Sequence, residues 1–317
     1  MENTLKAQIV DALASYMEAH KLTQSQVAKS TEINAAYLTA IRKHKYFMNV
    51  GGKNVDIADK YFHRIAKYVG FEVDKKYWER RKTPQMNELY TEIISAKDNG
   101  EPIVYVNETG AGKTYTLDFI QTLHPEDFFV IKASESDHMR DIIDKICEVL
   151  GIEKRTRSTS GRLREISREL KRLCERGLKP SLVFDEAEYF KFKTLCMYKE
   201  LYDHLNGLVS LGLVGTDQLV DNIEKMVMKN LPGMPQFYRR IKFKIRRGIR
   251  IDRRYEIFLQ DKTPEIQKWL RQNCDNYGEL SDVVTTVWRE ADRMNQQVTV
   301  EFIETVLGIT GKRLSVR

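Results

Sequence analysis

Long apolar runs, paired cysteines and repeats are all missing from this chain of 317 residues. It has no run of about 18 apolar residues, the length that a membrane helix needs. The start, MENTLKAQIV, lacks the basic-then-apolar order of a secretory signal. The four cysteines lie far apart without a C-x-x-C pair, which argues against structural zinc or a disulfide framework. These absences lead us to expect a folded cytoplasmic protein with no membrane partner.

Charge, by contrast, is abundant. Charged residues make up 31% of the sequence, and the 52 lysines and arginines outnumber the 45 acidic residues. An excess of this size favours an anionic partner only where the basic residues gather. The hydrophobic content of 42% argues against disorder, and the length allows one large core or two to three smaller ones.

A pair of short helices is predicted near the N-terminus, in LTQSQVAKSTEINAAYLTAIRKH. Thr23 and Gln26 have the spacing of a capping box, which predicts a helix over 24–31. Asn34 is a suitable N-cap for a second helix over 35–43. Two helices joined by so tight a turn form a helix-turn-helix, whose second helix can lie in a DNA major groove.

This segment resembles the phage-repressor type of helix-turn-helix, with two departures. Glu32 occupies the turn position that such motifs usually give to glycine. The groove-facing positions hold small residues that cannot make the bidentate contacts that read base edges: Ala35, Ala36, Thr39 and Ala40. Arg42 and Lys43 can still contact phosphates, so we expect binding to DNA with little sequence preference. The alternative is a small helical domain that packs or docks onto protein.

Between residues 84 and 260 the pattern changes to alternating strands and helices. Four short apolar runs are typical of buried parallel strands: PIVYV (102–106), FFVIKA (128–133), SLVFD (181–185) and LGLVG (211–215). Helices are expected between them, notably over 138–150 and 162–176. The predicted fold class is α/β, with a mostly parallel central sheet.

The predicted organisation has four parts. They are an N-terminal all-α helix-turn-helix domain (1–72), a linker with a leading helix (73–100), the α/β core (84–260) and a C-terminal helical lid (261–317). In the lid the helical patterns run over 264–274, 281–293 and 300–306.

The stretch NETGAGKT fits the phosphate-loop pattern G-x-x-x-x-G-K-[ST], except that Asn107 replaces the first glycine. Because asparagine tolerates a positive φ better than other non-glycine residues, we expect this departure to be mild. Glu108 is unusual there, since a carboxylate repels phosphate unless it points to solvent. The residues predicted to bind nucleotide are Asn107, Glu108, Thr109, Gly110, Ala111, Gly112, Lys113, Thr114 and Tyr115. Among them, Lys113 reaches the β and γ phosphates and the Thr114 hydroxyl holds Mg²⁺.

A second acidic motif, SLVFDEAEYF, follows an apolar strand. Asp185 is the expected second holder of Mg²⁺, and Glu186 is placed to orient and polarise the attacking water. An acidic pair after a strand is also compatible with a mere helix N-terminus. The extra strand FFVIKA between the two motifs is typical of hydrolytic motors rather than simple switch GTPases.

These motifs resemble those of the AAA+ ATPases, and among them the target-selection ATPases of transposable elements of the phage Mu type. The resemblance covers nearly the whole chain, although only NETGAGKT and VFDEAE are sharply specific. It implies a P-loop ATPase that uses ATP with Mg²⁺ and hydrolyses it slowly, stimulated by DNA or a partner. It also implies a homo-oligomer, as a filament or ring on double-stranded DNA, that recruits a transposase.

The resemblance also assigns roles outside the two motifs. Thr216 in LVGTDQ would be the polar sensor, and Arg240 in FYRRIKF, with Arg239 next, would reach the γ-phosphate of a neighbouring subunit. Arg240 is also compatible with a surface arginine that opens a basic strand. Ser281 stands where the family usually has a second-sensor arginine, which leaves the lid's contact with nucleotide open.

Basic residues gather in three segments that are candidates for DNA contact. The first gives Lys154, Arg155 and Arg157 in a loop and Arg162 and Arg164 in the first turn of the following helix. Cations at a helix N-terminus are unfavourable unless an anion compensates them, and a DNA backbone would do so. Lys191 and Lys193 form the second group, and KFKIRRGIRIDRRY is the third. A merely solubilising loop is the alternative for the first.

Three functions follow from these features. The leading hypothesis is an ATP-dependent, DNA-binding AAA+ ATPase that assembles on duplex DNA and activates a transposase. A replicative helicase loader would instead prefer single strands and capture a helicase. A nucleotide-gated repressor would show strong sequence specificity, against which the alanine-rich second helix argues.

Overall fold

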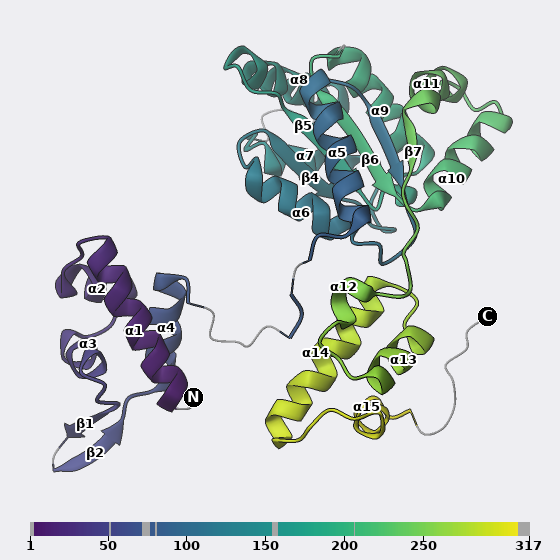
Figure 1. Ribbon diagram of the computed structural model, residues 1–317. Coiled ribbons are helices and arrows are strands. Elements are labelled where there is room, and N and C mark those ends of the chain that lie inside the picture. Colours follow the sequence, from purple (N-terminus) through teal and green to yellow (C-terminus); the bar gives the residue numbers. More distant parts are fainter. Residues whose placement is uncertain are drawn as a thin grey trace. The chain divides into compact units, whose positions relative to one another are not determined.

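The computed structural model describes residues 3–50, 52–71, 77–79, 81–153, 158–205 and 207–309 (Figure 1). The chain divides into two compact units, Met1–Tyr77 and Trp78–Arg317. Within the described ranges we find no helix that is both long and apolar enough to span a bilayer.

The N-terminal unit is built around two helices at the expected bounds. Its elements are α1 (Asn3–Ala19), α2 (Gln24–Thr31), α3 (Ala35–Arg42), β1 (Phe47–Val50), β2 (Lys53–Asp56) and α4 (Asp59–Val69). The capping box of Thr23 and Gln26 is formed, and the Asn34 side chain accepts from the Ala36 amide. A compact apolar core, including Leu13, Leu38 and Phe62, joins the helices.

The expectation of an entirely helical N-terminal domain is wrong in one respect. Strands β1 and β2 pair as an antiparallel hairpin, with Met48 opposite Val55. The sequence signal was the Gly51-Gly52 pair, because glycine permits the positive φ of tight hairpin turns. Gly52 has a φ of 83°.

Glu32 takes the left-handed backbone that glycine usually supplies, with φ 54° and ψ 36°. Left-handed backbone is unfavourable for residues with a Cβ. The Glu32 carboxylate contributes little in return, since its ion pair with Arg64 spans 3.8 Å between exposed groups. We therefore expect Glu32→Gly to stabilise the N-terminal unit by about 1 kcal/mol.

The measurement is amide hydrogen exchange in α2 and α3 of the full chain, which should slow. Glu18→Gly is the matched control, because Glu18 lies in a right-handed helix where glycine costs about 0.5–1 kcal/mol. Faster exchange in Glu32→Gly would contradict the argument.

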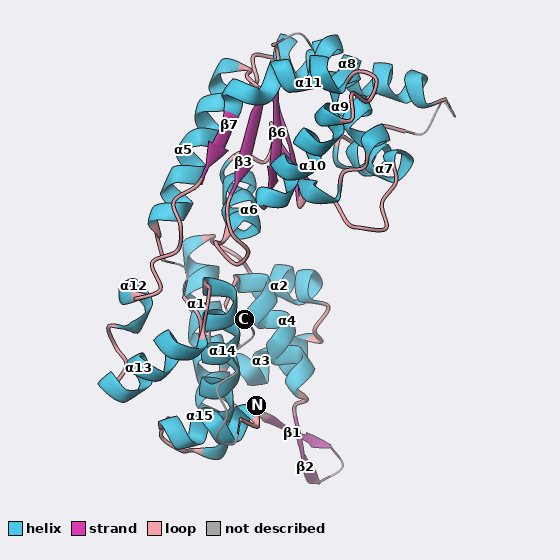
Figure 2. Ribbon diagram, turned by 90° about the vertical axis from the view of Figure 1, so that its right-hand side faces the viewer, coloured by secondary structure: helices cyan, strands magenta, loops and turns pink. Residues whose placement is uncertain are grey.

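The second unit contains a five-stranded sheet in the order β4-β5-β6-β3-β7, and every neighbouring pair is parallel. The predicted α/β fold class with a mostly parallel sheet is confirmed. The strands are β3 (Ile103–Val106), β4 (Phe128–Lys132), β5 (Ser181–Asp185), β6 (Ser210–Gly215) and β7 (Ile245–Arg247). Figure 2 shows β3, β6 and β7 side by side, with α5 running along them.

Helices cover both faces of this sheet. They are α5 (Pro84–Asn99), α6 (Lys113–Leu123), α7 (Met139–Val149), α8 (Thr159–Glu175), η1 (Ala187–Tyr189), α9 (Phe192–Leu205), α10 (Asp217–Met228), α11 (Met234–Ile241) and η2 (Lys242–Lys244). Alternate strand residues face opposite ways. Ile103 and Tyr105 therefore pack with α5 and α6, whereas Val104 and Val106 pack with the helices of the other face.

The C-terminal helices have an apolar core of their own that includes Trp269, Leu270 and Leu280. They are α12 (Glu256–Leu259), α13 (Pro264–Asn273), α14 (Tyr277–Met294) and α15 (Val300–Leu307). Helix α14 begins four residues before the expected start at Ser281, because the Asn276 side chain caps it by accepting from the Glu279 amide. Ala111 of the phosphate loop belongs to the same core, so the loop and these helices are packed together.

Candidate functional site

A cavity of 580 Å³ lies where the carboxyl ends of the parallel strands meet. Both motifs singled out from the sequence open onto it, through residues 109–116 and through Glu186. Thr216, which follows β6, lines it as well, as does Ser281 of α14. In a parallel sheet the strand ends converge on one edge, which explains why segments so far apart in sequence meet there.

The phosphate loop has the backbone that its glycines predict. Gly110 and Gly112 have φ of 73° and 82°. Gly112 precedes α6, so free amides at the start of a helix face the loop. The Lys113 ammonium donates to the carbonyl oxygens of Asn107 and Glu108, both at 2.9 Å. Burial lowers the pKa of Lys113, and nearby carboxylates oppose that shift.

Gly110 is also required by the helical lid. A Cβ at Gly110 would lie 2.2 Å from Oδ1 of Asn276, the N-cap of α14. Tyr277 and Gly278, in the first turn of that helix, line the cavity. The lid therefore contacts the phosphate loop directly, although Ser281 stands in place of an arginine.

The two predicted holders of Mg²⁺ are in direct contact. The Thr114 hydroxyl donates to Asp185 Oδ2 at 2.6 Å, and Asp185 is 1% exposed. Hydroxyl and carboxylate oxygens suit Mg²⁺, which takes few protein ligands and completes its shell with water and phosphate. The described residues contain no group of three or more His, Cys, Asp or Glu that could hold a metal. The donor set fits the ion of a magnesium nucleotide.

Glu186 lies beside this pair in a left-handed backbone, with φ 57°. Strained conformations of this kind are concentrated at functional sites. Burial raises the pKa of the Glu186 carboxyl, and the neighbouring carboxylates of Asp185 and Glu188 raise it further. Lys132, at the end of β4, places its ammonium 3.9 Å from Glu186 Oε1.

Sequence reasoning missed Glu188, which also lines the cavity. Its Oε1 accepts from the Thr216 amide at 3.2 Å, and a Cβ on Gly215 would lie 2.3 Å from its Oε2. Among the carboxylates that oppose the lowered pKa of Lys113, Glu188 has the largest effect. The available signal was the third acid of DEAE, which η1 turns back toward the strand ends.

An aromatic wall was missed as well, and one of its three rings, Trp78, comes from the segment taken for a linker. Trp78 stacks on Phe258 with ring centroids 4.5 Å apart, and Phe258 lies 5.4 Å from Tyr277. All three rings line the cavity, as do Arg81 and Met86. No sequence pattern links these residues, since they meet only through the packing of the lid.

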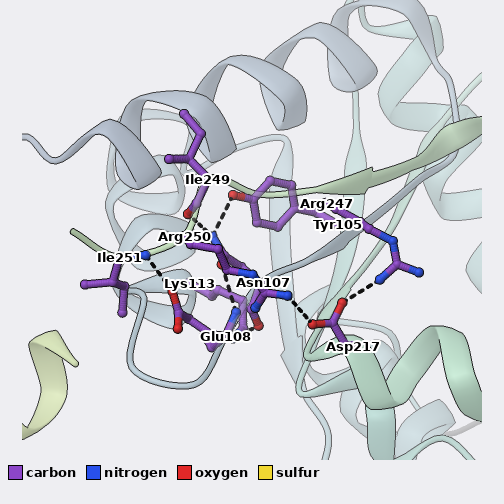
Figure 3. A network of polar contacts seen from close by, with 9 residues as sticks. All are labelled: Tyr105, Asn107, Glu108, Lys113, Asp217, Arg247, Ile249, Arg250 and Ile251. Atoms are coloured by element: carbon purple, nitrogen blue, oxygen red, sulfur yellow. Dashed lines mark hydrogen bonds and ion pairs between the residues drawn. The ribbon is translucent and has the colours of Figure 1, made fainter. Parts of the chain in front are cut away.

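The structure gives the first two residues of the loop roles that the sequence did not indicate. Asn107 is not among the residues with positive φ; it is 2% exposed and uses its side-chain amide, which donates to the carbonyl oxygen of Ile249 at 3.0 Å. The Glu108 side chain is half-buried, and its carboxylate accepts from the Ile251 amide at 2.5 Å (Figure 3). Both residues hold the chain segment that leads into the lid.

The predicted arginines lie away from this cavity. Arg240 on α11 pairs with Asp203 at 2.8 Å and also donates to the Gln236 carbonyl oxygen. Arg239 is exposed and makes no hydrogen bond or ion pair within the described part of the chain. Neither lines the cavity of its own chain.

The first DNA candidates have mixed environments. Lys154, Arg155 and Arg157 lie outside the described residues. Arg162 pairs with Asp144 of α7 and its side chain is 17% exposed, so an internal carboxylate, rather than DNA, compensates this cation. Arg164 is exposed.

The four other single candidates, Arg42, Lys43, Lys191 and Lys193, are all exposed. Lys191 lies 3.4 Å from His138 Nδ1, Lys193 and Lys43 are exposed, and Arg42 donates to Gln24. The third basic segment is largely paired with carboxylates of this chain, through Lys244, Arg246, Arg247, Arg250, Arg253 and Arg254. Most of its charge is therefore used internally.

Fold and site together are similar to those of the AAA+ ATPases. Residues 97–223 match the family described as AAA domain. The chain is 20% identical over 211 residues to the Mu-like prophage FluMu DNA transposition protein B of Haemophilus influenzae, a match that covers 67% of this chain and 70% of that protein. The predicted resemblance to AAA+ ATPases of transposable elements is confirmed.

One solved structure shares the fold. The crystal structure of Cdc6p from Pyrobaculum aerophilum superposes with a TM-score of 0.51 at 18% identity, covering 69% of this chain. The match spans 65% of that protein, just under two thirds of its length. Domain III of the replication initiation protein DnaA from Thermotoga maritima gives a TM-score of 0.43 at 15% identity, over 74% of this chain and 97% of that one.

Proposed function

We propose that this protein is an ATPase that, with ATP bound, assembles on duplex DNA with little sequence preference and recruits or activates a transposase. The observation that carries the proposal is the hydrogen bond between Thr114 and Asp185, at 2.6 Å, in one cavity with Lys113 and Glu186. The likeness to a DNA transposition protein supports the choice of pathway.

The nucleotide-binding residues act by charge and position. Lys113 exchanges its two carbonyl partners for phosphate oxygens, and the loop amides bind the remaining phosphates. Thr114 and Asp185 hold the Mg²⁺ that accompanies the nucleotide, whose phosphoanhydride bond is the source of free energy. The rings of Trp78, Phe258 and Tyr277 provide an apolar wall suited to a nucleobase.

Glu186 is the proposed general base. It takes a proton from the water whose oxygen attacks the γ-phosphorus, while the bond to the β-phosphate oxygen breaks and leaves ADP and phosphate. Its raised pKa suits a base that must accept a proton. Lys132, at 3.9 Å, favours the charged form and steadies the side chain.

Assembly of copies would complete the site. Arg239 and Arg240 cannot serve the cavity of their own chain, so their proposed contact with the γ-phosphate requires a neighbouring copy. Two large apolar side chains on elements that contact α11 are unusually exposed, Met228 at 77% and Phe243 at 78%. Such exposure on α10 and η2 supports an interface there. Because Arg239 makes no hydrogen bond or ion pair within the residues that the structure describes, it is the freer of the two to reach a neighbouring copy.

DNA contact is proposed for the exposed cations Arg164, Lys191 and Lys193, and for Arg42 and Lys43 of the N-terminal unit. Contacts of this type are with phosphates and carry no sequence information. The Thr39 hydroxyl is already bonded to Gln24 at 2.6 Å, which supports a second helix with little base reading.

The test is electron microscopy of the full chain with a slowly hydrolysed ATP analogue and Mg²⁺, with and without duplex DNA of arbitrary sequence. We expect filaments or rings on the duplex only with nucleotide. Binding should weaken steeply with salt, because each phosphate contact releases a counterion. Absence of assembly, or a strict preference for one sequence, would overturn the proposal.

Glu188 gives a separate prediction for the chemistry. Glu188→Ala removes the acceptor of the Thr216 amide and should lower the single-turnover hydrolysis rate about tenfold, because the Thr216 hydroxyl is then misplaced. Glu188→Gln keeps an oxygen acceptor and should retain most of the rate. Equal losses in both variants would show that the charge of Glu188, rather than this bond, is what matters.

A further inference from the structure

The segment between β7 and the lid, residues 248–251, is held by side chains rather than by secondary structure. We call it the connector. Four bonds fix its backbone: Ile249 N to Glu88 Oε2 at 2.7 Å, Asn107 Nδ2 to Ile249 O at 3.0 Å, Gln85 Nε2 to Arg250 O at 2.8 Å, and Ile251 N to Glu108 Oε1 at 2.5 Å. Two of the four side chains come from the phosphate loop.

The close approach of the loop to the connector is built into the sequence. Gly248 donates its amide to the Val106 carbonyl oxygen at 2.8 Å, which places the connector beside the end of β3. A Cβ at Gly248 would lie 2.1 Å from Tyr105 Oη and 2.4 Å from Asn107 Nδ2. Asn107 thus reaches the connector only because residue 248 has no side chain.

The same two loop residues are also bonded to the lysine of the loop. Lys113 donates to the carbonyl oxygens of Asn107 and Glu108, while the side chains of Asn107 and Glu108 hold Ile249 and Ile251 (Figure 3). The path from the ammonium to the lid connector therefore passes through two residues only. A phosphate that draws Lys113 away removes one end of each link.

We propose that Asn107 and Glu108 are positioning residues that couple nucleotide occupancy to the lid. When Lys113 leaves their carbonyls for phosphate, the loop backbone shifts and carries the connector with it. The lid follows, because the connector leads into it and Asn276 packs on Gly110 of the same loop. This inference rests on the proposed function in one step, the binding of phosphate by Lys113.

This proposal explains why Asn107 replaces the usual glycine, because only a side chain can hold the connector. A glycine at position 107 keeps the backbone of the loop but would release the connector. Asn107→Gly, which restores the usual loop pattern, should therefore uncouple the lid, and calorimetry measures its affinity for nucleotide.

The experiment is hydrogen exchange of the full chain, read at the Ile249 and Ile251 amides with and without the ATP analogue. In the wild type we expect nucleotide to change their exchange about fivefold. In Asn107→Gly the change should fall below about twofold while calorimetry still detects nucleotide binding. A wild-type response in Asn107→Gly would overturn the inference.

Two variants of Glu108 test whether its hydrogen bond to the connector, rather than its charge, transmits the response to nucleotide. Glu108→Gln keeps an oxygen that accepts from Ile251, whereas Glu108→Ala does not, and both remove the negative charge near Lys113. Any change in affinity shared by the two is a charge effect. We expect only Glu108→Gln to keep the nucleotide response of the connector, and equal behaviour of the two variants would contradict the coupling.

The outcomes also distinguish this inference from the proposed function. If the wild type fails to bind the analogue, the proposed function is wrong. If it binds while the connector amides do not respond, only the coupling is wrong. Circular dichroism melting of each variant checks that it is folded, so a lost response is read only from folded protein.

Discussion

Lys113→Ala is expected to lower the affinity for ATP by at least about 100-fold and to abolish nucleotide-dependent assembly on DNA. Hydrogen bonds to charged groups are worth about 1.5–3 kcal/mol each, and the ammonium is placed to make more than one with phosphate. Without phosphate, the ammonium donates to two carbonyl oxygens of the same loop at 2.9 Å, and it exchanges these bonds for bonds to phosphate. Isothermal titration calorimetry with the ATP analogue measures the loss.

Lys171→Ala is the matched control, because Lys171 is an exposed lysine of α8 that does not line the cavity. It should bind the analogue as the wild type does. Affinity within about threefold of wild type in Lys113→Ala would mean that the cavity holds phosphate, if at all, by its backbone amides alone.

Glu186→Gln is expected to reduce hydrolysis by about 10²–10³-fold while nucleotide binding persists. The amide has the same shape as the carboxylate but cannot take a proton from water. Removing a negative charge from beside Asp185 and Glu188 also relieves the repulsion that raises the pKa of Glu186, so phosphate binding should not weaken. Phosphate release under single-turnover conditions measures the rate.

The same variant should prolong the assembled state. If hydrolysis drives disassembly, filaments formed by Glu186→Gln with ATP itself will persist where wild-type filaments decay, and negative-stain images over time will show it. Glu175→Gln, an exposed glutamate at the end of α8, is the control that should hydrolyse and disassemble normally. Normal turnover in Glu186→Gln would remove Glu186 from the role of base.

Local signals predicted the elements well. Helices α2 and α3 begin where Thr23 and Asn34 cap them, because a cap acts within four residues of chain. The four core strands begin and end within a residue of their apolar runs. The errors had equally local causes, since the start of α14 was set by Asn276 and the N-terminal hairpin by its glycines.

The partners of several side chains lie far away in the sequence, so only the fold brings them together. The side-chain amide of Asn107 donates to Ile249, which lies 142 residues further along the chain. The loop pattern covers only neighbouring residues, so it explained Asn107 by its tolerance of positive φ and gave no sign of this hydrogen bond. Arg162 finds Asp144 on the neighbouring helix, and Arg240 finds Asp203 on α9. A run of basic letters cannot reveal that its charges are already paired.

The sequence alone determined the phosphate loop, the acidic motif and the strands that carry them, because backbone conformation and burial follow from neighbouring residues. Only the tertiary structure decided that Thr114 touches Asp185, that Glu188 reaches Thr216, and that the loop grips the lid connector. These contacts depend on how strand ends and lid converge in space. That convergence is a property of packing, which no single stretch of the chain encodes.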